Sequence, residues 1–358
     1  MSQNLYEAHR QWATRPADER FTSLQNLLDY TQKNKATSSQ VLRRMDDLKL
    51  QMTSDGGITL NGKLSQAYLT NWAFGQLCRT ISAPAAYLRS LSPDLVCNCL
   101  QFGLQESGTD CKILVSDRSR NGILDRYASA FTSPSYGRIW DADVVESLME
   151  AVENTSWHVP QSRSSQRSRN SGLYASDHDM FAFFVNDENP VEVGNAKLGR
   201  GFFCWNSETG AATFGLTTFL YNYVCGNHIV WEAENIQELK IIHRGHAPQR
   251  FYSAAIPLLN RFVENRALDE GIKSTAKKAM SVYIGNRLEK ALDWFKNKPF
   301  TKKEIVGAWE TGIAEGEEVS NLWGMVQGLT AYARDLDFVD KRVNLERRAG
   351  GLLSQYLG

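Results

Sequence analysis

The sequence contains no uninterrupted apolar run long enough to span a bilayer, which takes about 18 residues or more. Its first residues, MSQNLYEAHRQWATRPADERF, also lack the charged segment followed by an apolar core that marks a secretory signal. We therefore expect a cytoplasmic protein without a membrane partner.

Net charge is also absent, and cysteine is sparse. The 40 basic and 40 acidic residues cancel, so there is no global positive field to draw the protein onto a phosphate backbone. Any contact with nucleic acid must therefore come from a local basic surface. Six cysteines in 358 residues are too few for a disulfide scaffold, and most are expected to be buried thiols. The 42% hydrophobic content suits a globular chain of one large domain or two.

Hydrophobic periodicity begins with a short amphipathic helix over residues 18–33, for which Asp18 is placed to cap the start. The segment LKLQMTSDGGITLNG, residues 48–62, predicts a hairpin because two alternating runs flank an Asp-Gly-Gly turn. Helical spacing returns over residues 64–80 and 84–103.

Short β-rich runs separated by polar turns fill residues 111–245 and predict a sheet. One helix, DADVVESLMEAV, interrupts them, with Asp141 as its expected cap. Beyond residue 248 the pattern is helical, over residues 250–296, 301–315, 318–336 and 338–357. The predicted class is α+β, with a mixed, mostly antiparallel central sheet, N-terminal helices and a helical C-terminal third. We expect one region over residues 1–247 and a helical region over 248–358 packed on it or extending from it.

The stretch CGNHIVWEAENIQELKIIHRGH raises the possibility of a zinc site. It places Cys225, His228, His243 and His246 in two pairs separated by about 15 residues, a spacing and ligand set that tetrahedral zinc tolerates. The alternative is a buried thiol at Cys225 and a hydrogen-bonded sheet histidine at His243, and we favour it.

An arginine-rich segment, VPQSRSSQRSRNSGLY at residues 159–174, has no apolar residue between Val159 and Leu173 and predicts a mobile surface loop. Arginines with flanking hydroxyls suit phosphate contacts, although a solvated loop is an equally good interpretation. The nearby GNAKLGRG lacks the ending of a phosphate-binding P-loop. The predicted nucleic-acid contacts are Arg163, Arg167, Arg169, Lys197 and Arg200.

The NSETG turn at residues 206–210 lacks the Gly-x-Ser-x-Gly elbow of a nucleophilic serine, so we expect its side chains to satisfy backbone groups at a bend. A set of acidic residues could bind magnesium but is more typical of solvated turns: Asp177, Asp179, Asp187 and Glu188. A set of aromatic residues favours core packing over a base-stacking platform: Trp205, Phe214, Phe219, Tyr221 and Tyr223.

The block GRGFFCWNSETGAATFGLTTFLYNYVCGNHIVW, residues 199–231, resembles the phage/plasmid-like family of prokaryotic mobile elements, defined by a domain of unknown function of the nine-hundred-thirty-two type. LSQAYLTNWAFGQLCRTISAPAAYLRSL and DRYASAFTSPSYGRIWDADVVESL are similar to other parts of that family. Its pattern has glycine where His228 stands, which weakens a shared zinc site. The signature residues that the resemblance implies are Asn206, Ser207, Glu208, Gly210, Cys225, Asn227 and His243.

The resemblance implies an accessory protein of a phage or plasmid but no defined activity. We favour nucleic-acid binding, with single-stranded DNA binding or annealing in recombination or replication, by a homo-oligomer. The alternative is a non-enzymatic factor that binds a host or phage protein in defence or replication. A metal-dependent enzyme is third. No catalytic residue, metal or cofactor is predicted, and the sequence leans away from an enzyme without deciding the question.

Overall fold

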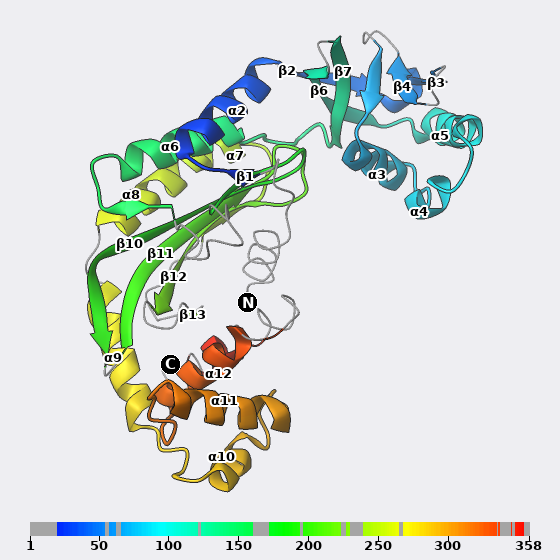
Figure 1. The fold of residues 1–358 in the computed structure, drawn as a ribbon. Helices are drawn as coiled ribbons and strands as arrows, with labels where there is room; N and C mark the ends of the chain where they lie inside the picture. The colour runs from blue at the N-terminus through cyan, green and yellow to red at the C-terminus, as the bar shows by residue number, and fades with distance from the viewer. Residues whose placement is uncertain are drawn as a thin grey trace.

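The computed structural model describes residues 20–53, 57–61, 66–120, 123–159, 172–193, 196–222, 227–229, 239–264, 268–334, 336, 345 and 348–353. These residues have the predicted α+β fold, with mostly antiparallel strands followed by C-terminal helices. The strands lie in two sheets, whereas the sequence predicted one central sheet. The smaller sheet projects from one end of the larger one, and helices α9 (Leu268–Ser281), α10 (Leu288–Phe295), α11 (Lys302–Ala314) and α12 (Leu322–Arg334) lie at the other end (Figure 1).

The smaller sheet and its helices come from one continuous segment, residues 38–132, which we call the small lobe. The strand order is β2-β6-β7-β5-β4-β3, in which β5 and β7 run parallel and the other pairs antiparallel. A separate hydrophobic core that includes Leu60, Leu77 and Leu100 lies between the sheet and its helices. The elements are β2 (Ser38–Arg44), η2 (Met45–Asp47), β3 (Lys49–Met52), β4 (Ile58–Asn61), β5 (Ala67–Leu69), α3 (Asn71–Thr80), α4 (Ala85–Leu88), α5 (Pro93–Ser107), β6 (Asp110–Arg120) and β7 (Ile123–Thr132).

The predicted hairpin is confirmed by the pairing of β3 with β4. The helix predicted over 64–80 is wrong in its first part, where β5 pairs with β4 and β7. Helix α3 begins only after Thr70, whose hydroxyl accepts the Ala73 N–H over 3.1 Å and so caps the first turn. The helix predicted over 84–103 divides into α4 and α5, because Pro93 suits the first turn of a new helix.

The larger sheet, which we call the large sheet, is antiparallel throughout its described pairs, in the order β1-β9-β10-β11-β12-β13. Strand β8 also pairs with β10, and β14 with β12. Long strands β10, β11 and β12 form its curved centre (Figure 1). The strands are β1 (Arg20–Phe21), β8 (Trp157–His158), β9 (Leu173–Ala175), β10 (Met180–Val193), β11 (Ala196–Asn206), β12 (Phe214–Asn222), β13 (Asn227–Ile229) and β14 (Leu239–Ile241).

Helices pack on one face of the large sheet and share a core with Phe184, Phe202 and Phe214. They are α2 (Leu24–Ala36), α6 (Asp141–Val152), α7 (Ala247–Arg250), η3 (Phe251–Ala255) and α8 (Ile256–Glu264). The first begins later than predicted because the Ser23 hydroxyl accepts the Asn26 N–H and caps it, whereas Asp18 lies outside the described residues.

The other face of the large sheet carries a second set of buried side chains, among them Phe183, Phe203 and Trp205. Because Trp205 and Phe214 are buried on opposite faces, the prediction that they belong to the core is confirmed. The side chains of Phe219, Tyr221 and Tyr223 lie outside the described residues.

The C-terminal helices form a third core, which includes Trp323, Met325 and Leu329. The Thr301 hydroxyl and the Glu304 carboxylate form a capping box at the start of α11, in agreement with the predicted helix over 301–315. Core residues of η3 and α8 pack with the large sheet, and the predicted boundary at residue 247 stays a prediction. The helices are α9 (Leu268–Ser281), α10 (Leu288–Phe295), α11 (Lys302–Ala314) and α12 (Leu322–Arg334).

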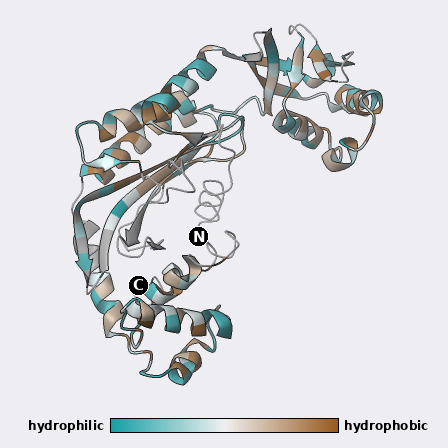
Figure 2. Ribbon diagram, in the orientation of Figure 1, coloured by the Kyte–Doolittle hydropathy of each residue, from teal (hydrophilic) through white to brown (hydrophobic). Residues whose placement is uncertain are grey.

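Hydrophobic and hydrophilic residues alternate along the helices that cover the large sheet (Figure 2), as expected for helices with one buried face. Across the described ranges, no helix combines the length and the apolar character needed to cross a membrane.

Candidate functional site

The NSETG turn lies where the large sheet, helix α6 and the small lobe meet. Asn206 and Ser207 have no exposed surface, and Gly210 adopts a φ of 84°, in the region that favours glycine. The Ser207 hydroxyl accepts the Ala211 N–H over 2.8 Å and donates to the carbonyl of His178. Ser207 and Glu208 satisfy backbone donors as predicted, whereas the Asn206 side chain donates to other groups instead.

Helix α6 is capped from the NSETG turn rather than by its own sequence. The sequence predicted Asp141 as the cap, but Trp140 occupies that position and its side chain makes no capping bond. Instead the Glu208 carboxylate accepts the Asp141 N–H over 2.8 Å. The Asn206 amide donates to Asp141 Oδ1 over 2.7 Å and to the Ile139 carbonyl over 2.9 Å. The helix start is therefore fixed to the end of β11.

Asp141 and Glu208 form a buried carboxyl pair. Burial raises the pKa of Asp141 well above its usual value, and the adjacent Glu208 raises it further. Burial also raises the pKa of Glu208 to about 7, although the bond from the Asp141 N–H and the charge of Arg138 oppose this shift. Because two carboxylates cannot both ionise at low cost in one dry site, the pair retains a proton at neutral pH.

Arg138 supplies a buried positive charge beside this pair, with only 4% of its surface exposed. Its guanidinium carbon lies 5.2 Å from the ring centre of Tyr136 and 5.6 Å from that of Trp140. These three residues share one side of an extended segment, so alternation places the cation against both aromatic rings. Its three guanidinium nitrogens have no hydrogen-bond partner within the described part of the chain. We expect one ionised carboxylate of the pair to balance its charge.

His243 extends this stack. Its ring lies parallel to that of Tyr136, with centres 5.2 Å apart, and its Nδ1 lies 3.2 Å from the Gly137 carbonyl. Burial lowers the pKa of His243 to about 4, so the ring is neutral at physiological pH. The Nδ1 contact agrees with the predicted hydrogen bond, but His243 lies beyond the end of β14 and not in the sheet, and its buried Nε2 has no hydrogen-bond partner among the described residues. His246, by contrast, is exposed at the start of α7.

A metal site would need several of these groups to converge. In the ranges that the structure covers, no three His, Cys, Asp or Glu side chains do so. Cys225 lies outside those ranges, and His228 lies in β13 with its side chain outside the description.

Polar contacts join the NSETG turn to the small lobe. The Thr209 carbonyl accepts the Trp72 indole N–H over 3.1 Å and the Gln76 amide over 2.6 Å. The indole of Trp72 also stacks on the ring of His178, with centres 5.4 Å apart. These contacts are hydrogen bonds and a ring stack rather than a shared apolar core, which is typical of an interface between separately packed units.

A polar cleft with a cavity of about 30 Å³, which is room for a water molecule or two, lies between the small lobe and the large sheet. The carboxyl pair Asp141 and Glu208 lines it together with hydroxyl, amide and charged groups. A pocket with convergent polar groups and shifted pKa values is the default candidate for a binding site. The remaining lining residues are Tyr30, Asn34, Ser38, Leu114, Ser116, Arg118, Ser129, Ser176, Asp177, His178 and Thr209.

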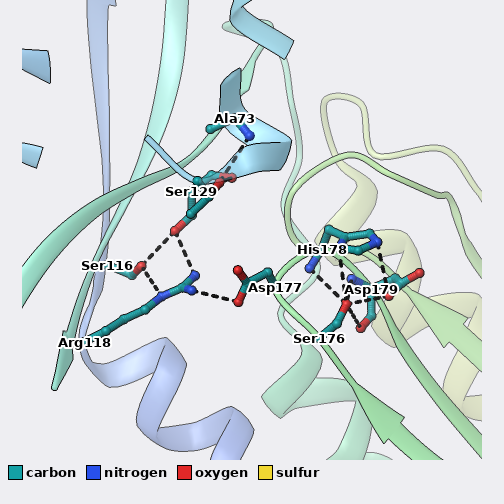
Figure 3. Close-up of polar contacts among 9 residues, drawn as sticks. Ala73, Ser116, Arg118, Ser129, Ser176, Asp177, His178 and Asp179 are labelled. Atoms are coloured by element: carbon teal, nitrogen blue, oxygen red, sulfur yellow. Dashed lines mark hydrogen bonds and ion pairs between the residues drawn. The ribbon is translucent and has the colours of Figure 1, made fainter. Parts of the chain in front are cut away.

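Arg118 is the cation of this cleft (Figure 3). Its Nε donates to the Ser116 hydroxyl over 3.3 Å and its Nη2 to the Ser129 hydroxyl over 3.2 Å. The guanidinium also lies over the Tyr127 ring at 5.3 Å. Its Nη1 donates to Asp177 Oδ1 over 2.7 Å, so one ion pair links β6 to the turn between β9 and β10.

The turn that contains Asp177 holds a serine, a histidine and an aspartate close together (Figure 3). The Ser176 hydroxyl donates to Asp179 Oδ1 over 2.6 Å, and it accepts the N–H groups of His178 and Asp179. Because the Ser176 hydroxyl lies 2.6 Å from Asp179 Oδ1 but 3.4 Å from His178 Nδ1, its shorter bond goes to the carboxylate, and this arrangement stabilises a turn and does not activate a nucleophile.

The predicted nucleic-acid contacts do not meet in one described place. Arg163, Arg167 and Arg169 lie outside the described residues, and Lys197 lies in β11 with its side chain outside the description. Arg200 is only 9% exposed, within β11 between β10 and β12. That burial does not fit the predicted surface contact. Among the signature residues, Asn227 lies in β13, and its side chain is likewise outside the description.

Sequence reasoning missed Arg118 and Arg138. Arg118 and Asp177 are 59 residues apart, so no local spacing points to their contact. For Arg138 a signal was present, because aromatic residues flank it at two positions on either side in YGRIW.

Comparison of the chain with protein-family models, curated proteins and solved structures finds no match, so the phage/plasmid-like resemblance stays a prediction.

Proposed function

We propose that this protein binds nucleic acid, preferentially single-stranded DNA, in the cleft between the small lobe and the large sheet. This keeps the nucleic-acid binding that we favour from the sequence and proposes a site for it. The homo-oligomer and the role in recombination or replication stay predictions.

The observation that carries this proposal is the position of Arg118. Its guanidinium is fixed by two serine hydroxyls on neighbouring strands, and its side chain is 34% exposed at the cleft. A planar guanidinium with neighbouring hydroxyls provides the donors that phosphate oxygens accept. The stacked rings of Trp72 and His178, which is itself a lining residue, offer an aromatic surface to a base.

The arginine-rich segment adjoins this region in the sequence, and its residues 160–171 lie outside the described ranges. Residues 160–171 precede β9, and β9 runs directly into the turn that holds Asp177. Gly172 is thus four residues before Ser176, a span of about 13 Å in extended chain. A neutral protein can bind a polyanion when its basic groups are gathered in one place.

The charge of the carboxyl pair does not oppose this role strongly. Because burial raises the pKa of both Asp141 and Glu208, the pair carries less negative charge at neutral pH than two exposed carboxylates would.

Arg118→Gln is expected to weaken binding of a fluorescein-labelled thymidine oligomer of about 20 nucleotides by about tenfold, because a charge-assisted phosphate contact is lost. Fluorescence anisotropy at about 50 to 200 mM salt measures this loss and the salt slope. The matched control is Arg126→Gln, because Arg126 pairs with Asp117 within the small lobe and its side chain is similarly exposed at 39%. Equal losses in the two variants, or no binding by wild-type protein at low salt, would contradict the proposal. The latter result would favour the protein-interaction alternative.

The triple substitution Arg163, Arg167 and Arg169→Ala is expected to reduce the slope of log affinity against log salt by about 2, because each phosphate contact to single strands contributes about 0.7. The same titration series gives this slope. A slope equal to that of the wild type would show that these arginines do not contact the DNA. Arg118→Gln would still test the cleft.

A further inference from the structure

We infer that the Asp177 carboxylate occupies the position on Arg118 that a phosphate of the DNA backbone would take. The Arg118–Asp177 ion pair then closes the cleft, and it breaks when a DNA strand binds. This rests on the proposed function and identifies the group that the cleft recognises as a phosphodiester. It also makes Asp177 an internal competitor of the ligand, in contrast to a residue that helps to bind it.

The position of Arg118 does not depend on Asp177. Its Nε and Nη2 are held by Ser116 and Ser129, and the Tyr127 ring lies against the guanidinium. All of these contacts come from β6 and β7 of the small lobe. If the carboxylate leaves, the guanidinium therefore stays in position with Nη1 available to another oxygen acceptor.

The turn that carries Asp177 does not depend on the ion pair either. The Ser176 N–H donates to the Asp179 carbonyl over 2.8 Å, and the Ser176 hydroxyl accepts from two backbone N–H groups. The Asp177 side chain points away from this network toward Arg118 (Figure 3). It is 51% exposed, so the carboxylate can turn into solvent without breaking the turn.

The two partners belong to separately packed units. Arg118 lies on β6 of the small lobe, whereas Asp177 follows β9 of the large sheet, and each unit has its own hydrophobic core. Exposed ion pairs contribute little to stability, so the Asp177 carboxylate can leave Arg118 at low cost. A phosphate and a carboxylate present similar acceptor oxygens to a guanidinium, and the exchange leaves Arg118 paired in both states.

The inference predicts that substitutions of the two partners change the binding affinity in opposite directions. Asp177→Asn removes a competing negative charge and keeps the shape of the side chain, so the labelled thymidine oligomer should bind about fivefold more tightly at low salt, the scale set by one exposed ion pair. Its salt slope should also steepen. Arg118→Gln should weaken binding. If the pair had only a structural role, both variants would lose affinity or neither would change, and either result overturns the inference.

Asp117→Asn is the matched control, because Asp117 pairs with Arg126 on the neighbouring strand and its substitution removes the same charge from the strand that carries Arg118. It should change affinity less than twofold, as expected of a charge outside the cleft. If Asp117→Asn raised the binding affinity as much as Asp177→Asn does, the effect would come from net charge alone, and the inference would be overturned. An oligomer with neutral methylphosphonate linkages tests the ligand group. With this neutral oligomer, Asp177→Asn should no longer raise the binding affinity. If it still does, the phosphodiester is not the group that the cleft recognises.

The outcomes separate the two proposals. If neither wild-type protein nor Asp177→Asn binds the oligomer at low salt, while both retain the same thermal unfolding transition, the proposed function fails and the inference fails with it. If wild-type protein binds but Asp177→Asn is not tighter, the inference alone fails.

Discussion

Gly137→Ala is expected to lower the free energy of unfolding by about 3 kcal/mol, at the upper end of what overpacking costs. A β-carbon at this position would lie 2.4 Å from the Gly245 carbonyl oxygen and 3.2 Å from the Ala247 β-carbon. The first of these is a backbone atom, so a rotamer change cannot relieve the contact. The segment that carries Tyr136 and Arg138 must instead move away from the turn after β14. Chemical denaturation by urea measures the loss.

Gly351→Ala is the control for that measurement. Gly351 lies within the helical residues 348–353, and a β-carbon there meets no atom within 4 Å. Alanine is the better helix former, so the change should leave stability within about 1 kcal/mol, on the stabilising side. If Gly137→Ala were as well tolerated as Gly351→Ala, the tight contact between residues 137 and 245 would not be needed for the fold.

Glu208→Gln is expected to stabilise the protein at pH 8 by about 2 kcal/mol. Burial raises the pKa of Glu208 from 4.5 to about 7, so the folded state binds the proton more tightly than the unfolded state does. Stability must then fall as pH rises between these two values, because ionisation is favoured only after unfolding. Glutamine keeps an oxygen that can accept the Asp141 N–H and removes the ionisation.

Urea denaturation at about pH 4 and pH 8 tests whether Glu208→Gln stabilises the protein. The stabilisation should disappear at the lower pH, where Glu208 is neutral in both the folded and the unfolded state. Glu304→Gln is the opposite control. Burial favours the neutral acid at Glu304, but hydrogen bonds from Arg348 and from the Thr301 N–H hold its pKa below the usual value. Its ionised form therefore stabilises the folded state, and glutamine should be destabilising at pH 8 but not at low pH. Destabilisation by Glu208→Gln at pH 8 would contradict the buried pair described above.

The sequence predicted those helices, hairpins and turns that depend on residues close together in the chain. The helix over residues 141–152 and the hairpin over 48–62 follow from periodicity and from an Asp-Gly-Gly turn, and both are present. The NSETG turn was also interpreted correctly at Ser207 and Glu208, because Ser and Glu at a bend have few roles other than bonding the backbone. The division of the strands into two sheets could not be predicted, since pairing such as that of β5 with β7 joins residues about 60 positions apart.

The candidate site was hidden from sequence reasoning for the same reason. Its cation and its acidic partner come from different sheets, and Arg118 occurs in an ordinary strand pattern. Asp141 was expected to cap its own helix by the usual rule, but Glu208 takes that role from 67 residues away. A cap supplied by a residue this distant in the chain leaves no signal in the local sequence.

The insertion of the small lobe between α2 and α6 has a consequence for how the chain folds. The core of the large sheet needs these two helices side by side, yet residues 38–132 separate them. While that segment is unfolded, bringing the helices together carries the entropy of closing a long loop. Once β2, β6 and β7 pair, the ends of the segment are on the order of 15 Å apart, and the loop becomes short. The small lobe should therefore form first, and its mutations should slow the assembly of a core in which it takes no part.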